Sequence, residues 1–191
     1  MSDAPSLKVQ RLTPEAIEPY GWVIGEKPVA GDPALFATES VKFRTAHDFD
    51  PGTGGVAEMV WANYGPAPLV VNALESHRLT EQSFTPLGGS FPLIHVVAPP
   101  PKDPMATNIV PDMSRAAAFL IDGSKGVCLR RGTWHAHFSL GGWANFLMMT
   151  RRSTTVEIER TMRAGGSLAS MLETAIWSET GCRGGYRLHL S

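Results

Sequence analysis

The sequence has 191 residues, a net charge of −1 and two cysteines. A chain of this length buries a full core without disulfide staples and is most simply one domain, residues 1–191. The balanced charge excludes a strongly basic binder of nucleic acid or of a membrane surface, and no run of about 18 apolar residues predicts a membrane span. Because two distant cysteines make no disulfide framework and the N-terminus lacks the apolar core of a secretory signal, we expect a cytoplasmic protein.

A short helix and many short strands are predicted in chain order. Thr13 and Pro14 are typical of a helix start, as cap and first helical residue, and we expect this helix to end at Gly21. Glycine and proline are scattered between short apolar runs, which indicates an all-β barrel or jelly roll. We expect strands near 22–24, 41–44, 56–62, 68–75, 81–87, 92–98, 115–121, 126–130, 135–140, 144–151 and 154–159.

The C-terminal residues 155–191 follow this strand-rich part of the chain. Apolar residues between Met162 and Ile176 have a partly helical spacing, with Gly165 and Gly166 interrupting it. We therefore expect a C-terminal helix near 167–177 that packs on the barrel or on a partner subunit.

Four side chains have the composition of a metal site. Glu75 and His77 stand two residues apart, so on a strand they point to the same face. Gln82 begins the next apolar run, and His135 follows a glycine-containing turn. Two imidazoles, a carboxylate and an amide oxygen suit a divalent metal such as Ni, Zn, Mn or Fe. The alternative is that the histidines are hydrogen-bonded barrel residues without a metal.

Two other histidines and a cysteine have both a functional and a structural interpretation. His137 shares the strand face of His135, so it is a candidate to assist in catalysis or to replace it as a ligand. His95 lies within an apolar strand, where a satisfied core residue is the commoner case. Cys128 lies near Arg130, but its apolar surroundings favour an inert thiol over an activated one.

Arginines and aromatic residues are candidates for holding a substrate. A guanidinium group binds a carboxylate through two hydrogen bonds, so we expect Arg131, and next Arg44, to clamp a small acid, with Arg151 as a further candidate. Surface ion pairs are the default alternative for all three. Phe84 and Trp134 are expected to wall the pocket, although both are also typical core residues.

Several ordered motifs lie within about residues 10–151. They are the opening Leu12-Thr13-Pro14-Glu15, Leu74-Glu75-Ser76-His77 with Gln82, Phe84, Pro86-Leu87 and Gly88, then Pro111-Asp112-Met113-Ser114, Arg131-Gly132-Thr133-Trp134-His135, and Asn145-Phe146-Leu147 through Arg151. Together these motifs resemble the ureidoglycolate lyase family of cupin enzymes. Relative to the general cupin pattern, Glu75 stands at the first histidine's position and Gln82 at the carboxylate's.

The resemblance implies a cupin fold and a lyase that splits ureidoglycolate into glyoxylate and urea, as a homodimer. It implies metal ligation by Glu75, His77, Gln82 and His135, with His77, His135, His137 and Arg131 acting in catalysis. The sequence departs from the family at Ser76, at Asn145, at His135-Ala136-His137 and at Thr38-Glu39-Ser40. These departures keep two alternatives open: a metal-dependent cupin enzyme for another small hydroxy or keto acid, and a non-enzymatic small-acid-binding cupin.

Overall fold

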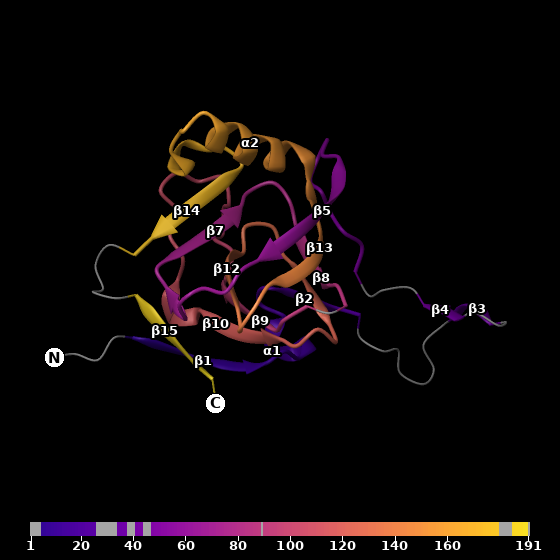
Figure 1. Ribbon diagram of the computed structural model, residues 1–191. Helices are drawn as coiled ribbons and strands as arrows, with labels where there is room; N and C mark the ends of the chain where they lie inside the picture. Colours follow the sequence, from indigo (N-terminus) through magenta and orange to yellow (C-terminus); the bar gives the residue numbers. More distant parts are fainter. Residues whose placement is uncertain are drawn as a thin grey trace.

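The structure is a computed structural model that describes residues 5–25, 47–88, 90–179 and 185–190, and the backbone of 34–37 and 41–43. Its main body consists of two curled sheets that face each other as a half-barrel (Figure 1), which confirms the predicted cupin-like all-β class. In spatial order, the eight-stranded sheet contains β14 (Thr174–Ser178), β7 (Ala73–His77), β12 (Trp134–Ser139), β9 (Leu93–Ala98), β10 (Ala117–Ile121), β1 (Ser6–Arg11), β15 (Tyr186–Leu190) and β6 (Val70–Val71). The five-stranded sheet contains β2 (Gly21–Ile24), β11 (Gly126–Leu129), β8 (Gln82–Pro86), β13 (Ala144–Arg151) and β5 (Ala57–Tyr64), and β3 (Ala34–Ala37) pairs with β4 (Val41–Phe43).

Apolar side chains from both sheets fill the space between them. One buried cluster includes Phe84, Phe119 and Phe146, contributed by β8, β10 and β13. A second cluster covers the other face of the eight-stranded sheet and includes Trp134 and Ile94. Strand β9 belongs to both clusters and is buried on both faces, which is why its sequence reads as a continuous apolar run instead of an alternating one.

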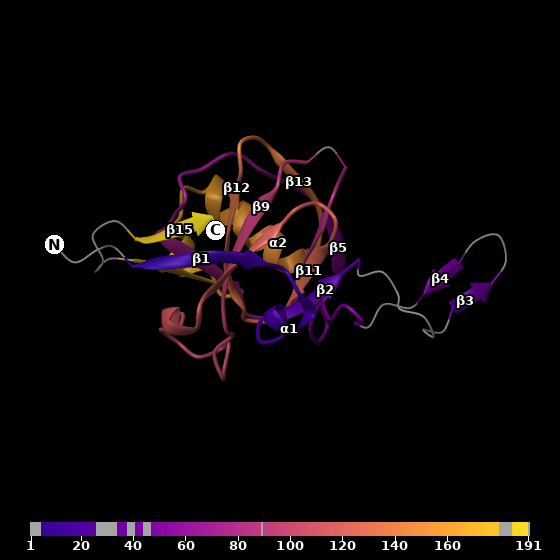
Figure 2. The same cartoon turned by 90° about the horizontal axis from the view of Figure 1, so that it is seen from below.

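The N-terminal helix α1 (Pro14–Ile17) begins as predicted, because the Thr13 side chain accepts the backbone N–H of Ala16. It ends at Ile17, before the predicted Gly21, because Gly21 already belongs to β2 and pairs with β11. A Cβ at Gly21 would lie 2.1 Å from the carbonyl oxygen of Cys128, so this close strand approach requires glycine. Figure 2 shows β1 beside β15, with α1 following β1.

The strand predicted at 154–159 and the helix predicted at 167–177 are both wrong. The chain instead forms helix α2 (Arg152–Arg163), a 3₁₀ turn η2 (Leu168–Ser170) and strand β14. Charged residues at helical spacing support α2, as in the 2.6 Å ion pair between Arg163 and Glu159. The segment 174–178 becomes a strand because the free edge of β7 offers its backbone hydrogen bonds.

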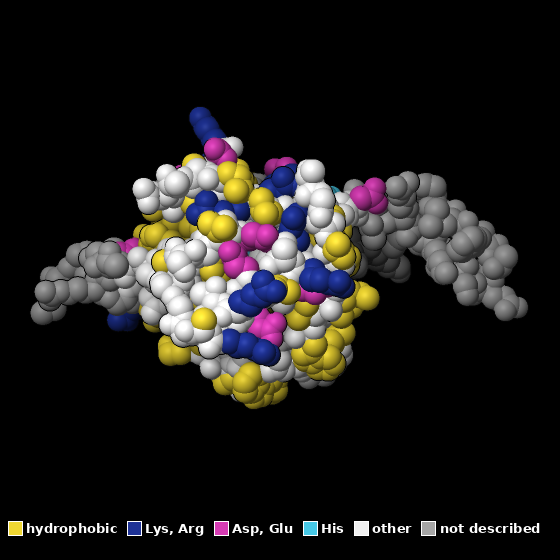
Figure 3. Space-filling model, turned by 90° about the horizontal axis from the view of Figure 1, so that it is seen from above, with side chains coloured by type: hydrophobic (Ala, Val, Ile, Leu, Met, Phe, Trp, Pro, Cys, Tyr) yellow, Lys and Arg dark blue, Asp and Glu magenta, His cyan; other side chains and the backbone are white. Residues whose placement is uncertain are grey.

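The outer face of α2 is a mixed surface. Seen from the α2 side, Lys and Arg side chains lie next to Asp and Glu side chains among apolar ones (Figure 3). Gly165, with φ of +64°, follows the last turn, and its N–H bonds to the carbonyl of Met162, which ends the helix. Among the described residues, no helix is long and apolar enough to cross a membrane.

Several other strands differ from the sequence prediction. Strands β1, β14 and β15 were not predicted, and the predicted strand 68–75 is divided into β6 and β7. The predicted strand 115–121 begins later, at Ala117, because the 3₁₀ turn η1 (Met113–Arg115) precedes it. β1 and β15 lie inside the eight-stranded sheet, but most of their residues are exposed or half-buried, so neither has the apolar run of a buried strand.

Candidate metal centre

Neighbouring strands bring Glu75, His77 and His135 together. Glu75 and His77 lie on the same face of β7, and His135 of β12 is the directly opposed partner of Glu75. The Glu75 Oε1 atom lies 3.3 Å from His135 Nε2 and 3.9 Å from His77 Nε2. The three donor atoms all lie within 4.8 Å of one another, so one ion can contact all three.

Hydrogen bonds at the other ring nitrogens orient both imidazoles. His135 Nδ1 lies 3.0 Å from the carbonyl oxygen of Thr133, which can only accept, so Nδ1 carries a proton. His77 Nδ1 lies 3.1 Å from the hydroxyl of Thr174. The buried Nε2 atoms of both histidines lack a hydrogen-bond partner and face the Glu75 carboxylate. Such a set fits a divalent cation, because metal-ligating histidines hold the other nitrogen in this way.

The protonation states also suit a metal. Burial acts to raise the pKa of Glu75, but the contact with His135 and the charge of His77 outweigh it and lower that pKa to about 2. Burial lowers the pKa of His77 to about 4, against an opposing effect of Glu75. At neutral pH the site therefore presents a charged carboxylate and a neutral His77, which are the forms that bind metal ions.

Gln82 is the remaining side chain that the sequence predicted as a metal ligand. It begins β8, its Oε1 atom is buried without a hydrogen-bond partner, and its side chain lies within hydrogen-bonding reach of His77. An unpartnered amide oxygen at this place is a candidate fourth ligand, as the sequence predicted for Gln82.

The buried side of the site contains two further histidines. The His137 ring lies 5.4 Å from the His135 ring and stacks on Tyr64 at 4.4 Å. His95, directly opposite His137 on β9, is fully buried, and neither of its ring nitrogens has a hydrogen-bond partner. His95 is therefore buried as expected, but it is not a satisfied core residue. Its strand parity alone did not reveal that it faces His137.

A cavity opens beside the metal centre. Strands β7 and β12 pair at two positions, and a space of about 300 Å³ lies where they separate. Its lining residues are Tyr64, Ala73, Leu74, Glu75, His135, Ala136, His137, Leu168 and Ile176. The cavity wall is thus mostly apolar, and its polar groups are those of Tyr64, Glu75, His135 and His137.

The turn before β12 fixes the position of His135. Gly132 has φ of +79°, a left-handed conformation that favours glycine, and its N–H bonds to the carbonyl of His77 at 2.9 Å. A Cβ at Gly132 would also lie 3.0 Å from Pro104. This turn therefore attaches the start of β12 to the end of β7.

A second group of donors, His47, Glu81 and Cys128, also lies within 4.8 Å. Here the Glu81 Oε2 atom already accepts the backbone N–H of Asp50 at 2.8 Å and contacts His47 Nε2 at 2.7 Å. Burial and the Glu81 charge raise the pKa of Cys128 to about 12, so the thiol stays neutral. The Glu81 carboxylate therefore already has hydrogen-bond partners within the protein. We assign this second group a structural role.

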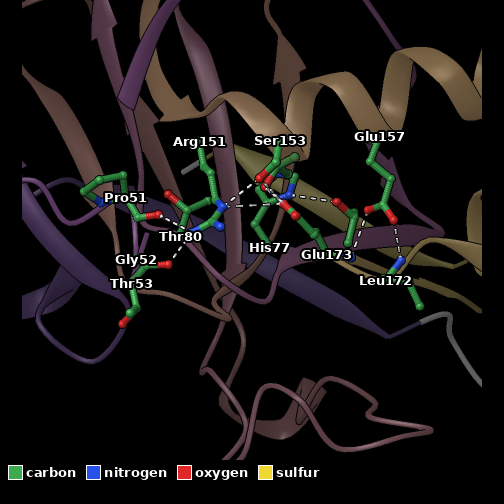
Figure 4. A network of polar contacts seen from close by, with 12 residues as sticks. Pro51, Gly52, Thr53, His77, Thr80, Arg151, Ser153, Glu157, Leu172 and Glu173 are labelled. Atoms are coloured by element: carbon green, nitrogen blue, oxygen red, sulfur yellow. Dashed lines mark hydrogen bonds and ion pairs between the residues drawn. The ribbon is translucent and has the colours of Figure 1, made fainter. Parts of the chain in front are cut away.

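The candidate arginines form contacts away from the cavity. Arg131 makes a 2.7 Å ion pair with Asp50, and neither Arg131 nor Arg151 lines the cavity. The Arg151 guanidinium bonds to the carbonyl of Pro51 at 3.1 Å (Figure 4). Arg44 lies outside the described residues, as does the departure at 38–40. A carboxylate clamp by any of the three stays a prediction.

The two aromatic candidates lie on different sides of the eight-stranded sheet. Phe84 is fully buried, with its ring 4.6 Å from the His137 ring, so it packs behind the histidines. Trp134 precedes His135 on β12 and belongs to the cluster on the opposite face. A contact of either aromatic side chain with a substrate stays a prediction.

Comparison with known proteins gives consistent matches. The family model of ureidoglycolate lyase matches residues 4–166. A ureidoglycolate lyase of Pseudomonas aeruginosa (strain UCBPP-PA14) is 34% identical over 134 residues, which cover 68% of this chain and 73% of that protein. A ureidoglycolate lyase of Burkholderia cepacia is 33% identical over 138 residues, 71% of this chain and 73% of its own. One from Pseudomonas syringae pv. syringae (strain B728a) is 32% identical over 132 residues, which cover 68% of this chain and 72% of that protein.

Proposed function

The chain belongs to the ureidoglycolate lyase family, and we propose that it is the lyase that cleaves ureidoglycolate into glyoxylate and urea in allantoin breakdown. The observation that carries this proposal is the meeting of Glu75, His77 and His135 at a cavity of about 300 Å³ in a chain of this family. A cavity of this size accommodates a small hydroxy acid.

Glu75, His77 and His135 would hold a divalent metal ion, with Gln82 as a fourth ligand. Nickel, zinc, manganese and iron all accept a mixed imidazole and oxygen set, so the donor types do not choose among them. When bound, such an ion polarises the oxygens of the substrate and lowers the pKa of its hydroxyl.

The reaction needs one proton moved from oxygen to nitrogen. The hydroxyl of ureidoglycolate loses its proton, a carbonyl forms on the same carbon, the carbon–nitrogen bond breaks, and the ureido nitrogen takes up a proton as urea departs. We assign the transfer to His137, whose Nε2 atom has no hydrogen-bond partner and which lines the cavity.

The substrate carboxylate needs a cationic partner, and Arg131 and Arg44 remain the proposed clamp. The ion pair of Arg131 with Asp50 is largely exposed, at 40% and 56% of the two side chains. An exposed pair of this kind contributes about 0–1 kcal/mol, so the Arg131 guanidinium exchanges partners at little cost.

Purified protein tests the proposal by release of glyoxylate from ureidoglycolate. We expect turnover that a chelator removes and that added nickel, manganese or zinc restores, and we expect His77→Ala to remove it without unfolding the protein. Turnover in His77→Ala at the wild-type rate would contradict the metal site, and no turnover with any metal would contradict the lyase.

A second candidate is an enzyme for another small hydroxy or keto acid. Its support is the apolar wall that Leu168 and Ile176 form in the cavity, because such a wall suits a substrate with an apolar group in place of the ureido group. A panel of small hydroxy and keto acids under the same assay separates the two enzymes. A chain that binds such acids and turns none over is the non-enzymatic alternative.

We further propose that the chain acts as one domain, in the cytoplasm and as a homodimer. The outer face of β5 and β13 supports the dimer, because Met59 and Trp61 expose 69% and 67% of their surface on an edge strand. Leu147, opposite Trp61 on β13, extends this apolar face.

A further inference from the structure

The segment beyond the family match forms one side of the metal centre. The family model ends at residue 166, and β14 lies after it in the chain. β14 pairs antiparallel with β7 so that Thr174 is opposite His77 and Ile176 is opposite Glu75. Leu168 and Ile176 also line the cavity. The C-terminal segment is therefore in contact with both ligands that β7 supplies.

Thr174 is the member of this segment with a polar contact to a proposed ligand. Its side chain is fully enclosed, with 1% of the residue exposed, and its Oγ1 atom lies 3.1 Å from Nδ1 of His77. The opposite ring nitrogen, Nε2, is buried without a hydrogen-bond partner and points towards Glu75. A proton on Nδ1 leaves a lone pair on Nε2, which is the form a metal needs.

We propose that Thr174 is a positioning residue, whose hydroxyl oxygen accepts the Nδ1–H of His77 and holds Nε2 as a lone pair directed at Glu75 and His135. The inference rests on the metal site proposed above. It gives the C-terminal segment a role in the site, because without β14 the Nδ1 atom of His77 loses this partner.

The chain around Thr174 is anchored well enough for this role. The two carboxylate oxygens of Glu157 on α2 accept the backbone N–H groups of Leu172 and Glu173, at 2.7 and 2.8 Å (Figure 4). The Glu173 carboxylate in turn accepts the hydroxyl of Thr154 at 2.6 Å. Helix α2 thus fixes the start of β14, and a rigid support of this kind is what a ligand's partner requires.

Titration of metal-free protein with Ni²⁺ alone, followed by calorimetry, tests the proposal without substrate. We expect Thr174→Val, which keeps the shape and removes the hydroxyl, to raise the Kd for Ni²⁺ by about 10 to 100-fold. Thr174→Ser keeps the hydroxyl and should return the Kd to within about threefold of wild type. The matched control is Ser139→Ala, at a serine that is 2% exposed and whose hydroxyl donates to the carbonyl of Gly142, away from β14.

The control separates positioning from loss of stability. Both variants lose one buried hydrogen bond and should unfold at similarly lowered temperatures, but Ser139→Ala should bind Ni²⁺ as wild type does. An unchanged Kd in folded Thr174→Val, or an equal loss in both variants, would overturn the positioning role.

A measurement on unmutated protein covers the case in which Thr174→Val does not fold. Nitrogen-15 NMR of the imidazoles, with His77 assigned through His77→Asn, should show the proton of His77 on Nδ1 in the metal-free state. A proton on Nε2 would overturn the proposal. If wild type shows the Nδ1 proton but binds no Ni²⁺, the positioning of the ring stands and the proposed metal function fails.

Discussion

Glu75 and His135 are directly opposed residues of β7 and β12, and their Oε1 and Nε2 atoms lie 3.3 Å apart. An imidazole lone pair and a carboxylate oxygen this close together can both bind the same divalent cation. The pair is therefore the centre of the site, and His77 and Gln82 complete it from two sides.

The first prediction concerns the charge of Glu75. Glu75→Gln keeps the shape of the side chain and removes its charge, so the affinity for Ni²⁺ should fall by about 100-fold or more. This loss exceeds the one expected from replacing a residue that only supports a ligand. Calorimetric titration of metal-free protein measures it, with Glu159→Gln on exposed α2 as the control. Retained affinity in Glu75→Gln would remove Glu75 from the ligand set.

The second prediction separates His137 from the ligands. His137 lines the cavity, but its ring lies 5.4 Å from that of His135, outside the group of donors that meet. His137→Asn should therefore leave the Kd for Ni²⁺ within about threefold of wild type and lower kcat by about 10² to 10⁴-fold, as expected for loss of a proton-transfer group. A loss of metal without a loss of kcat at saturating metal would reverse the assignment.

Local patterns in the sequence predicted part of this site. The two-residue spacing of Glu75 and His77 determines that both share a strand face, and this holds in β7. The pairing of His135 with Glu75 depends on strand register, which the family motifs implied and which spacing cannot give. His95 and Thr174 were missed as neighbours of the site because their strands join it only through long-range pairing.

The errors in the tail have a related cause. The apolar spacing between Met162 and Ile176 suggested a helix, but the pairing partner of 174–178 is the edge of β7, about a hundred residues earlier. Helix α2 was read as a strand because its apolar residues are few and alternate over a short stretch. The internal strands β9 and β13 and the long edge strand β5 were predicted close to their observed bounds.

The third prediction is acid sensitivity of the fold. Burial lowers the pKa of His77 to about 4 and those of His95 and His137 well below their usual values. The unfolded chain therefore binds more protons, so stability is full above about pH 6.5 and falls as the pH drops towards 4, by about 1.4 kcal/mol per pH unit for each proton.

Chemical denaturation of the metal-free protein at a series of pH values measures this slope. His95→Phe removes one of the protons taken up on unfolding and should flatten the slope by about one proton. Equal slopes in wild type and His95→Phe would show that His95 does not titrate as a buried neutral histidine.

The fourth prediction concerns the proposed dimer. Trp61 and Met59 project from the outer face of β5, which is the last strand of its sheet, and Trp61 pairs with Leu147 of β13. Replacing Trp61 by glutamate removes an aromatic anchor from the proposed interface and puts a charge in its place. Such an anchor typically contributes about 2 kcal/mol or more to the binding free energy. Trp61→Glu should therefore weaken dimerisation by roughly 30-fold or more in sedimentation velocity runs.

A matched control introduces the same negative charge on a different surface of the protein. Met162→Glu places the same side chain on α2, at a residue that is 65% exposed, and should leave the dimer intact. A wild-type chain that sediments as a monomer at every concentration would end the dimer proposal. A dimer that survives Trp61→Glu would place the interface on another face, because an edge strand buried by a partner cannot accommodate a charge at its centre without loss of affinity.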